Sequence, residues 1–213
     1  MMARCSMIET LRSQGIGDER VLAVMGQIPR ERFVPADSQG QAYSDAALPI
    51  GHDQTISSPF IVALTTQLVR PSPERRALDI GTGSGYQAAI LADLCKDVYS
   101  IEIVEPLADE ARQRLAALDY KNVNIRCGDG YRGWPENAPF DIIVVAAAPD
   151  HVPQAFVDQL APGGRLVIPV GQNSQELLLI QKDANGLVQR RQVLPVKFVP
   201  MTGEAQDNQK KHS

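Results

Sequence analysis

Two short segments combine residue types and spacings that could bind a ligand or orient a reacting group. In the first, residues 54–59 read QTISSP and lead into a helical pattern with an apolar face. Pro59 suits the first position of a helix, which makes Ser58 the natural N-cap. A cap needs one hydroxyl, so those of Thr55 and Ser57 are left over as candidates for contacts with a ligand. The alternative is that Ser57 is the cap and Ser58 is merely exposed.

The second segment is a glycine-rich turn followed by an acid. Residues 78–87 read LDIGTGSGYQ, which places Gly81, Gly83 and Gly85 between a strand pattern and a helix pattern. Glycines there let the chain turn tightly and let its main chain approach a ligand closely. Glu102 ends the next strand pattern, about 20 residues later, where a carboxylate can accept hydrogen bonds from both hydroxyls of a ribose. A tight turn without a ligand is the alternative, but the glycines and the acid together favour a ribose-containing ligand.

The glycine spacing narrows the choice of that ligand. The dinucleotide fingerprint G-x-G-x-x-G would need its third glycine at Tyr86, whose side chain is too large for such close packing. A nicotinamide-dependent dehydrogenase is therefore the weaker interpretation. No Gly-Lys-Ser/Thr sequence follows the turn, so a nucleoside triphosphate is not favoured either.

The elements that must position these residues follow from the hydrophobic pattern. Residues 75–170 alternate short apolar strands with helical segments, which indicates parallel strands with crossover helices on both faces of the sheet. The pattern of residues 175–199 predicts an antiparallel pair that turns at Asn185-Gly186. The predicted fold class is therefore α/β: a Rossmann-like, doubly wound, mostly parallel sheet with a C-terminal antiparallel hairpin.

A helical and loop extension precedes this core. Residues 7–14 and 18–28 have helical patterns, and Asp18 can cap the second. Residues 29–57 have neither period, and we interpret them as a long loop with short turns. Their apolar residues indicate that this loop packs on the rest of the protein; they are Phe33, Val34, Tyr43, Leu48 and Ile50.

Composition excludes several classes of function. The 213 residues carry a net charge of -4 and no block of Lys and Arg, so neither nucleic acid nor a membrane is an expected partner. Cys5, Cys95 and Cys127 are scattered and stand apart from the histidines, so we predict no metal site and no disulfide framework. The chain begins without a signal-peptide pattern. We expect a cytoplasmic protein and, as the simplest state, a monomer.

Six segments in order resemble one family. The pattern G-x-G-x-G after Asp79 is similar to motif I of S-adenosylmethionine-dependent methyltransferases. QTISSP, LDIGTGSGYQAAILA, GDGYRGW, APFDIIVVAAA, QLAPGGRLVIPVG and VKFVPMTG together resemble the protein-L-isoaspartate O-methyltransferase family. The likeness runs from about PRERFVP to Gly203, and the QTIS segment is its most specific part.

The resemblance implies a function in the repair of damaged proteins. The methyl group of S-adenosyl-L-methionine would pass to the free α-carboxylate of an isoaspartyl residue in a peptide or protein. We expect one catalytic domain over residues 1–213. Residues 1–74 would form a substrate-side extension, residues 75–203 the cofactor-binding core and residues 204–213 a polar tail.

The resemblance also implies roles for individual residues. Ser57 would be the catalytic position and, with Thr55, would bind the substrate carboxylate. The residues carried over as cofactor-binding are Gly81, Thr82, Gly83 and Ser84 around the methionine end, Glu102 at the ribose, and Leu107, Asp129 and Gly130 towards the adenine. A turn-forming role for Asp129 and a core position for Leu107 are the alternatives.

Three positions depart from the common family pattern. Ala146 stands where many members have Thr, Asp79 where Glu is frequent, and Asp53 where Gly is usual. These departures put substrate preference in question more than the reaction. The remaining alternatives are a methyltransferase for another carboxylate or a small molecule, and a protein that binds S-adenosylmethionine without turnover.

Overall fold

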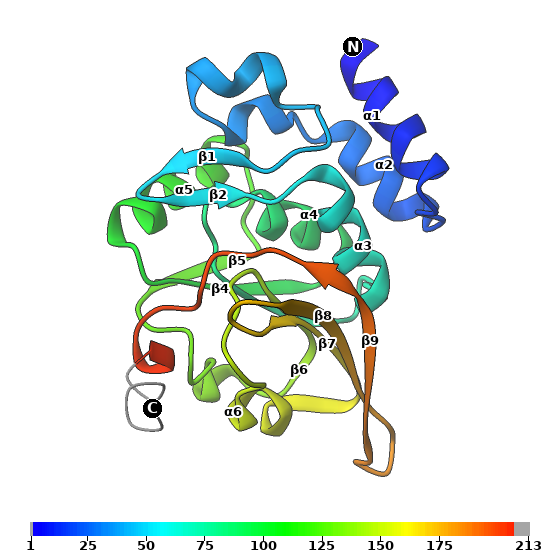
Figure 1. Cartoon of the computed structure of the whole chain (residues 1–213), viewed down its shortest axis with the longest axis vertical. Coiled ribbons are helices and arrows are strands. Elements are labelled where there is room, and N and C mark those ends of the chain that lie inside the picture. Colours follow the sequence, from blue (N-terminus) through cyan, green and yellow to red (C-terminus); the bar gives the residue numbers. More distant parts are fainter. Residues whose placement is uncertain (1, 207–213) are drawn as a thin grey trace.

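The computed structural model describes residues 2–206 and has a seven-stranded sheet at its centre (Figure 1). The strand order is β5-β4-β3-β6-β7-β8-β9. The strands of this sheet are β3 (Arg76–Ile80), β4 (Asp97–Glu102), β5 (Val123–Cys127), β6 (Phe140–Val145), β7 (Leu160–Val170), β8 (Gln175–Lys182) and β9 (Val188–Val196). Strands β3 to β7 pair in parallel, whereas β7-β8 and β8-β9 pair antiparallel. The predicted fold class, including its C-terminal hairpin, is confirmed.

The sheet separates two hydrophobic clusters. The larger contains the inward faces of α3 (Pro59–Val69), α4 (Tyr86–Leu94) and α5 (Glu105–Ala117). The smaller lies against the other face, under the short helix α6 (Gln154–Asp158) and the loop that contains η3 (Pro135–Asn137). In Figure 1, α3, α4 and α5 lie on one side of the sheet and the short α6 lies on the other. Helices therefore cover both faces as predicted, but one face only thinly.

The N-terminal extension has more regular structure than expected. Helices α1 (Met2–Ser13) and α2 (Glu19–Gln27) are present as predicted. The stretch interpreted as a long loop instead holds two 3-10 helices, η1 (Arg30–Phe33) and η2 (Ala36–Gln41), and a hairpin of β1 (Leu48–Gly51) and β2 (Gln54–Ile56). Such elements are too short to show a hydrophobic period, which is why the sequence pattern did not indicate them.

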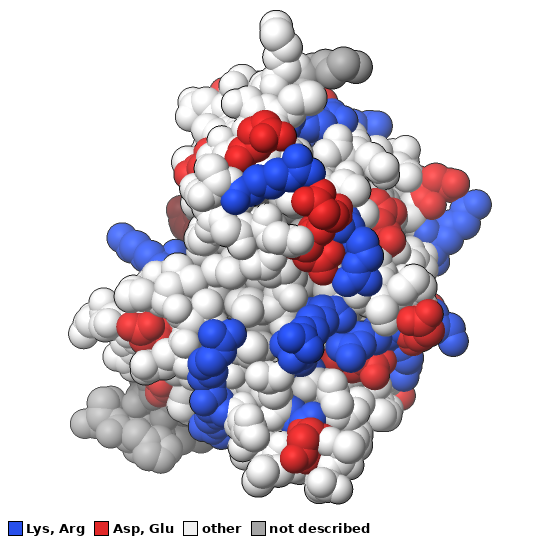
Figure 2. Space-filling model, turned by 90° about the vertical axis from the view of Figure 1, so that its right-hand side faces the viewer, with Lys and Arg blue, Asp and Glu red and all other residues white. Residues whose placement is uncertain are grey.

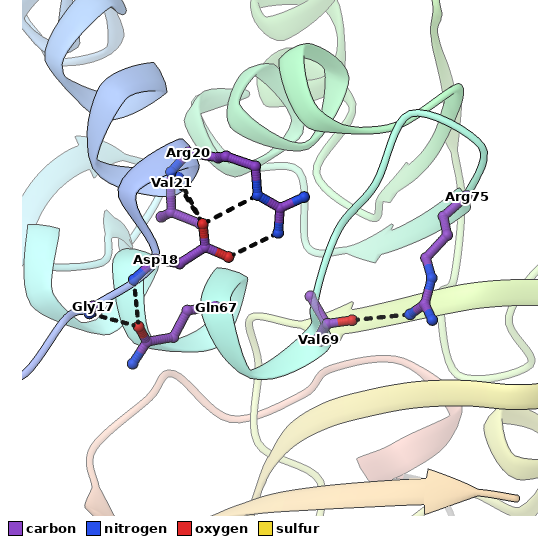
Figure 3. Close-up of polar contacts among 7 residues, drawn as sticks. All are labelled: Gly17, Asp18, Arg20, Val21, Gln67, Val69 and Arg75. Carbon is purple, nitrogen blue, oxygen red and sulfur yellow. Dashed lines mark hydrogen bonds and ion pairs between the residues drawn. The ribbon is translucent and has the colours of Figure 1, made fainter.

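The extension is tied to α3, the helix that follows the QTIS segment. Figure 3 shows Asp18 as the N-cap of α2, with its carboxylate accepting from the N–H groups of Arg20 and Val21. The main-chain N–H groups of Gly17 and Asp18 donate to the amide oxygen of Gln67 in α3 at 3.1 and 3.4 Å. The cap predicted at Asp18 is confirmed, and it docks α2 on α3.

Arginine side chains close the other end of α3. Arg75 donates to the carbonyl of Val69 at 3.3 Å (Figure 3), and Arg165 donates to that of Leu68 at 3.0 Å. Cations suit a helix C-terminus because the last carbonyls point there without partners.

On this side of the molecule Figure 2 shows basic and acidic groups intermixed. Among the described residues, no helix is long and apolar enough to cross a membrane.

The C-terminal segment returns to the sheet. The Ala148 N–H donates to the carbonyl of Val199, and the Met201 N–H donates to the carbonyl of Ala148, both at 2.8 Å. Arg132 then forms an ion pair with Glu204 at 2.7 Å. The polar tail predicted for residues 204–213 is therefore anchored at its start, and residues 207–213 lie outside the described part of the chain.

Candidate functional site

The glycine loop lies at the carboxyl ends of the central strands, between β3 and α4. Gly81, Gly83 and Gly85 all have positive φ, at 92°, 52° and 88°. A Cβ on Gly83 would lie 3.3 Å from Ile50 in the β1-β2 hairpin, and one on Gly81 would lie 3.3 Å from the Cβ of Ala146. The glycines therefore permit both the turn and the close approach of its neighbours.

Glu102 ends β4 beside this loop. One carboxylate oxygen accepts from the Gly83 N–H at 2.7 Å and the other from the Val104 N–H at 2.9 Å. The residue is 5% exposed and lines a cavity together with Gly81 and Gly83. Each carboxylate oxygen has a second lone pair, so the fixed carboxylate can still accept hydrogen bonds from a ligand.

The cavity beside Glu102 is formed by six segments of the chain. Its lining residues include Gln54 and Thr55 of β2, Ile103, Asp129 and Gly130, Ala146 and Ala147, and Val199 to Thr202. A Cβ on Gly130 would lie 2.6 Å from Ile80, so the floor of the cavity needs glycine at that position. The segment 199–202 was not predicted as part of the site, although it belongs to the VKFVPMTG motif.

Asp129 lines the cavity but also holds structure together. Its Oδ1 accepts from the Tyr131 N–H at 2.9 Å, and its Oδ2 accepts from the Glu204 N–H at 2.7 Å. The turn-forming role considered for Asp129 is thus present, together with a link to the C-terminal segment. Any contact of its carboxylate with a ligand must use the remaining lone pairs.

Leu107 occupies the core position that was considered as its alternative, whereas Ile103 lies at the cavity. Leu107, carried over as a contact for the adenine, is 1% exposed in the core cluster under α5 and lines no part of the cavity. Ile103 is 40% exposed and lies at the cavity edge, four residues before Leu107. The sequence pattern did not separate them because both are aliphatic residues near the start of one helix.

Thr82 and Ser84 lie in a second hollow that shares Gly81 and Gly83 with the cavity. Thr82 is 3% exposed, and its hydroxyl lies 2.6 Å from that of Ser100, which donates to Asp79 at 2.7 Å. Asp79 has no exposed surface, and this burial raises its pKa to about 7. Thr82 therefore belongs to a buried polar chain beneath the loop.

Of the two serines of QTISSP, Ser58 caps the helix and Ser57 does not, as predicted. Ser58 is the N-cap of α3, and its hydroxyl accepts from the Ile61 N–H at 3.4 Å. The N–H group of Phe60, one residue before Ile61, donates to the carboxylate of Asp45 at 3.0 Å. The Ser57 hydroxyl makes no hydrogen bond within residues 2–206 and lines the second hollow and a third. Because the carboxylate of Asp45 accepts from the Phe60 N–H group, the N-terminus of α3 is not left open for another anion.

Thr55 and Ala146 lie where three hollows meet. Both residues line the cavity beside Glu102, the second hollow and the third. The third hollow runs between the start of α3 and the extended segment 195–199, and Lys197 lies at its edge. Ser57 is therefore separated from Glu102 by the glycine loop and Thr55, an arrangement that could hold two ligands end to end.

Comparison with known proteins agrees with this geometry. A family model described as protein-L-isoaspartate(D-aspartate) O-methyltransferase matches residues 2–206. A protein-L-isoaspartate O-methyltransferase 2 from Polaromonas sp. strain JS666 is 57% identical to this chain over 189 residues. That alignment covers 88% of this chain and 90% of the relative.

Solved structures extend the likeness to the fold. One protein-L-isoaspartate O-methyltransferase superposes with a TM-score of 0.88 at 29% identity, covering 97% of this chain and 69% of its own. A second, described as such an enzyme from Plasmodium falciparum in complex with S-adenosyl-L-homocysteine, has a TM-score of 0.80 at 28% identity and covers 92% and 97%. The chain belongs to the protein-L-isoaspartate(D-aspartate) O-methyltransferase family.

Proposed function

We propose that this chain transfers the methyl group of S-adenosyl-L-methionine to the free α-carboxylate of L-isoaspartyl residues in damaged peptides and proteins. The observation that carries the proposal is the placement of the Ser57 hydroxyl, which has no hydrogen-bond partner within residues 2–206, beside a glycine loop that is itself tied to the acid Glu102. Family membership supplies the reaction and the substrate class. The roles of the individual residues are proposals from the geometry.

The residues around Glu102 fit the cofactor. Glu102 would accept hydrogen bonds from the ribose hydroxyls, because its two backbone contacts leave lone pairs free. The absence of side chains at Gly81 and Gly83 would admit the methionine part, with Thr82 and Ser84 supporting the loop from below. Ile103, in place of Leu107, would meet the adenine, in the cavity that Asp129 and Gly130 also line.

The reaction demands positioning more than acid–base chemistry. The cofactor supplies a methyl group on a positively charged sulfur, which is its own leaving group. An isoaspartyl carboxylate is already ionised at neutral pH. One of its oxygens forms the new bond to carbon as the carbon–sulfur bond breaks, and that electron pair stays on sulfur. Correct orientation of such partners can contribute about 7–11 kcal/mol.

Ser57 and Thr55 would provide this orientation from the substrate side. The Ser57 hydroxyl is half-buried and free to donate, whereas Thr55 is exposed at the junction of the hollows. We propose that both donate to the isoaspartyl carboxylate and hold one oxygen on the methyl axis. The extended segment 195–199 would run beside the peptide, whose main chain offers the hydrogen bonds common to all damage sites.

The test is methyl transfer to a matched pair of peptides, one with isoaspartate and the other with normal aspartate at the same position. We expect transfer to the isoaspartyl peptide alone, with one methyl ester formed. Transfer to neither peptide, while S-adenosyl-L-homocysteine still binds, would refute the proposal and favour a binding protein without turnover. Transfer to both would favour a methyltransferase of general carboxylates.

A further inference from the structure

Two arginines each donate a hydrogen bond to a main-chain carbonyl in a different segment of the candidate site. The guanidinium of Arg30 donates a hydrogen bond of 2.7 Å to the main-chain carbonyl of Ser57. The guanidinium of Arg114 donates one of 2.7 Å to the main-chain carbonyl of Ser84, in the glycine loop. We propose that Arg30 positions the substrate segment and Arg114 positions the cofactor loop, each independently of the other. This inference rests on the proposed function, which assigns the two ligands to these segments.

The side chain of Arg30 is fixed in one position by its surroundings. It has no exposed surface, and a second hydrogen bond of 2.7 Å joins it to the carbonyl of Ala42. Its guanidinium lies 4.7 Å from the ring centroid of Tyr86, which is 1% exposed. A planar group fixed by two carbonyls and an aromatic face has little freedom, so it transmits its position to Ser57.

Arg30 is also a buried charge. It forms no ion pair with any residue in the range 2–206, and burial lowers its pKa, with the charge of Asp45 acting in the opposite direction. An unpaired buried cation is expensive, so a merely structural site would favour an apolar residue there. The proposed substrate is a carboxylate that binds at Ser57, and a cation behind that segment favours it. Charge and position therefore both point to the substrate.

Arg114 reaches the cofactor loop from α5. Its side chain is 23% exposed, and its ion pair with Glu110, one turn away, is loose at 3.7 Å. The short contact is instead the one with Ser84, which immediately precedes Gly85 in the loop. Loss of this contact would free the loop between Gly81 and Gly85 without touching the segment that contains Ser57.

The experiment compares Arg30→Met with Arg114→Met in two binding assays and one kinetic assay. Calorimetry gives the Kd of S-adenosyl-L-homocysteine, and steady-state kinetics gives the KM of an isoaspartyl peptide. For Arg30→Met we expect the peptide KM to rise about tenfold or more while the Kd of S-adenosyl-L-homocysteine stays within about twofold. For Arg114→Met we expect the Kd of S-adenosyl-L-homocysteine to rise about tenfold or more while the peptide KM stays within about twofold. Peptide binding to enzyme saturated with S-adenosyl-L-homocysteine checks the first result without turnover.

Chemical rescue distinguishes positioning from simple loss of structure. Arg30→Ala should regain a low peptide KM in dilute guanidinium, whereas urea, which has a similar shape but no charge, should not restore it. A rise of both the peptide KM and the Kd of S-adenosyl-L-homocysteine in each variant would overturn the inference. Rescue by urea would overturn it as well. The wild-type enzyme in the same assay separates this failure from that of the proposed function, since a wild type that methylates no isoaspartyl peptide refutes the function itself.

Discussion

The carboxylate of Glu102 and the main-chain N–H of Gly83 are joined by a hydrogen bond of 2.7 Å, which ties the end of β4 to the glycine loop after β3. These two strands are parallel neighbours, so their carboxyl ends lie at the same edge of the sheet. We propose that the acid has two tasks: it fixes the loop that would surround one part of the cofactor, and it would present its own oxygens to another part.

Glu102→Gln should weaken binding of the cofactor. An amide nitrogen in place of one oxygen would face an N–H donor, from Gly83 or from Val104, and would lose an acceptor for the ribose. We expect the KM for S-adenosyl-L-methionine to rise by about tenfold to hundredfold. Glu105→Gln, three residues later on an exposed part of α5, is the control and should change this KM by less than about twofold. Equal effects of the two changes would contradict the role of Glu102.

Asp53→Gly should stabilise the hairpin that carries Thr55. Asp53 has φ of 56° and its neighbour His52 has φ of 51°, conformations in which a Cβ is unfavourable. Glycine adopts this conformation without strain, and Asp is among the residues that tolerate it. We expect the free energy of unfolding to increase by up to about 1 kcal/mol for Gly and to fall for Asp53→Ala. Chemical denaturation measures both, and a gain with Ala would exclude this account.

Asp79→Asn should change how stability depends on pH. Burial raises the pKa of Asp79 from an ordinary value of 3.8 to about 7 in the folded protein. Between these values the unfolded chain binds fewer protons than the folded one, so stability falls as pH rises from about 4 to about 7. The loss can approach about 4 kcal/mol. Asp79→Asn should remove this slope and be the more stable protein at pH 8, whereas the exposed control Asp109→Asn should keep the slope.

Ser58→Ala should cost stability more than turnover. Its hydroxyl caps α3 through the Ile61 N–H, and loss of such a cap typically costs about 1 kcal/mol. Pro59 at the first helical position still fixes the start of the helix, so the helix should persist. Thermal unfolding with a kinetic assay on the same preparation would measure both quantities. A collapse of kcat with unchanged stability would mean that the roles of Ser57 and Ser58 are reversed.

Much of this fold follows from local patterns. The parallel core, the hairpin at Gly186 and the caps at Asp18 and Ser58 follow from hydrophobic periods and residue-specific turn chemistry, and the structure confirms them. The 3-10 helices and the β1-β2 hairpin did not follow; Phe33 of η1 packs on Tyr86 of α4, and Ile50 of β1 lies beside Gly83 of the glycine loop. Short elements of this kind have no sequence period of their own.

The site was predictable where one segment makes it and less so where distant segments meet. The glycine loop, Glu102 and Ser57 are each recognisable within a few residues of sequence. Arg30 and the segment 199–202 reach the candidate site only through tertiary structure. Ile103 lines the cavity and Leu107 does not, a difference that their places in the sequence did not indicate. The carboxylate of Asp45 at the start of α3 had no sequence signal either.

The most direct test of the account is the single-turnover rate of Ser57→Ala, with enzyme saturated by both S-adenosyl-L-methionine and an isoaspartyl peptide. Saturation removes differences in affinity, so the rate reports how well the carboxylate is held on the methyl axis. We predict a rate lower by about tenfold to hundredfold with a free energy of unfolding equal to that of the wild type. A wild-type rate, or a loss of stability equal to the loss of rate, would contradict the placement of Ser57 at the reacting carboxylate.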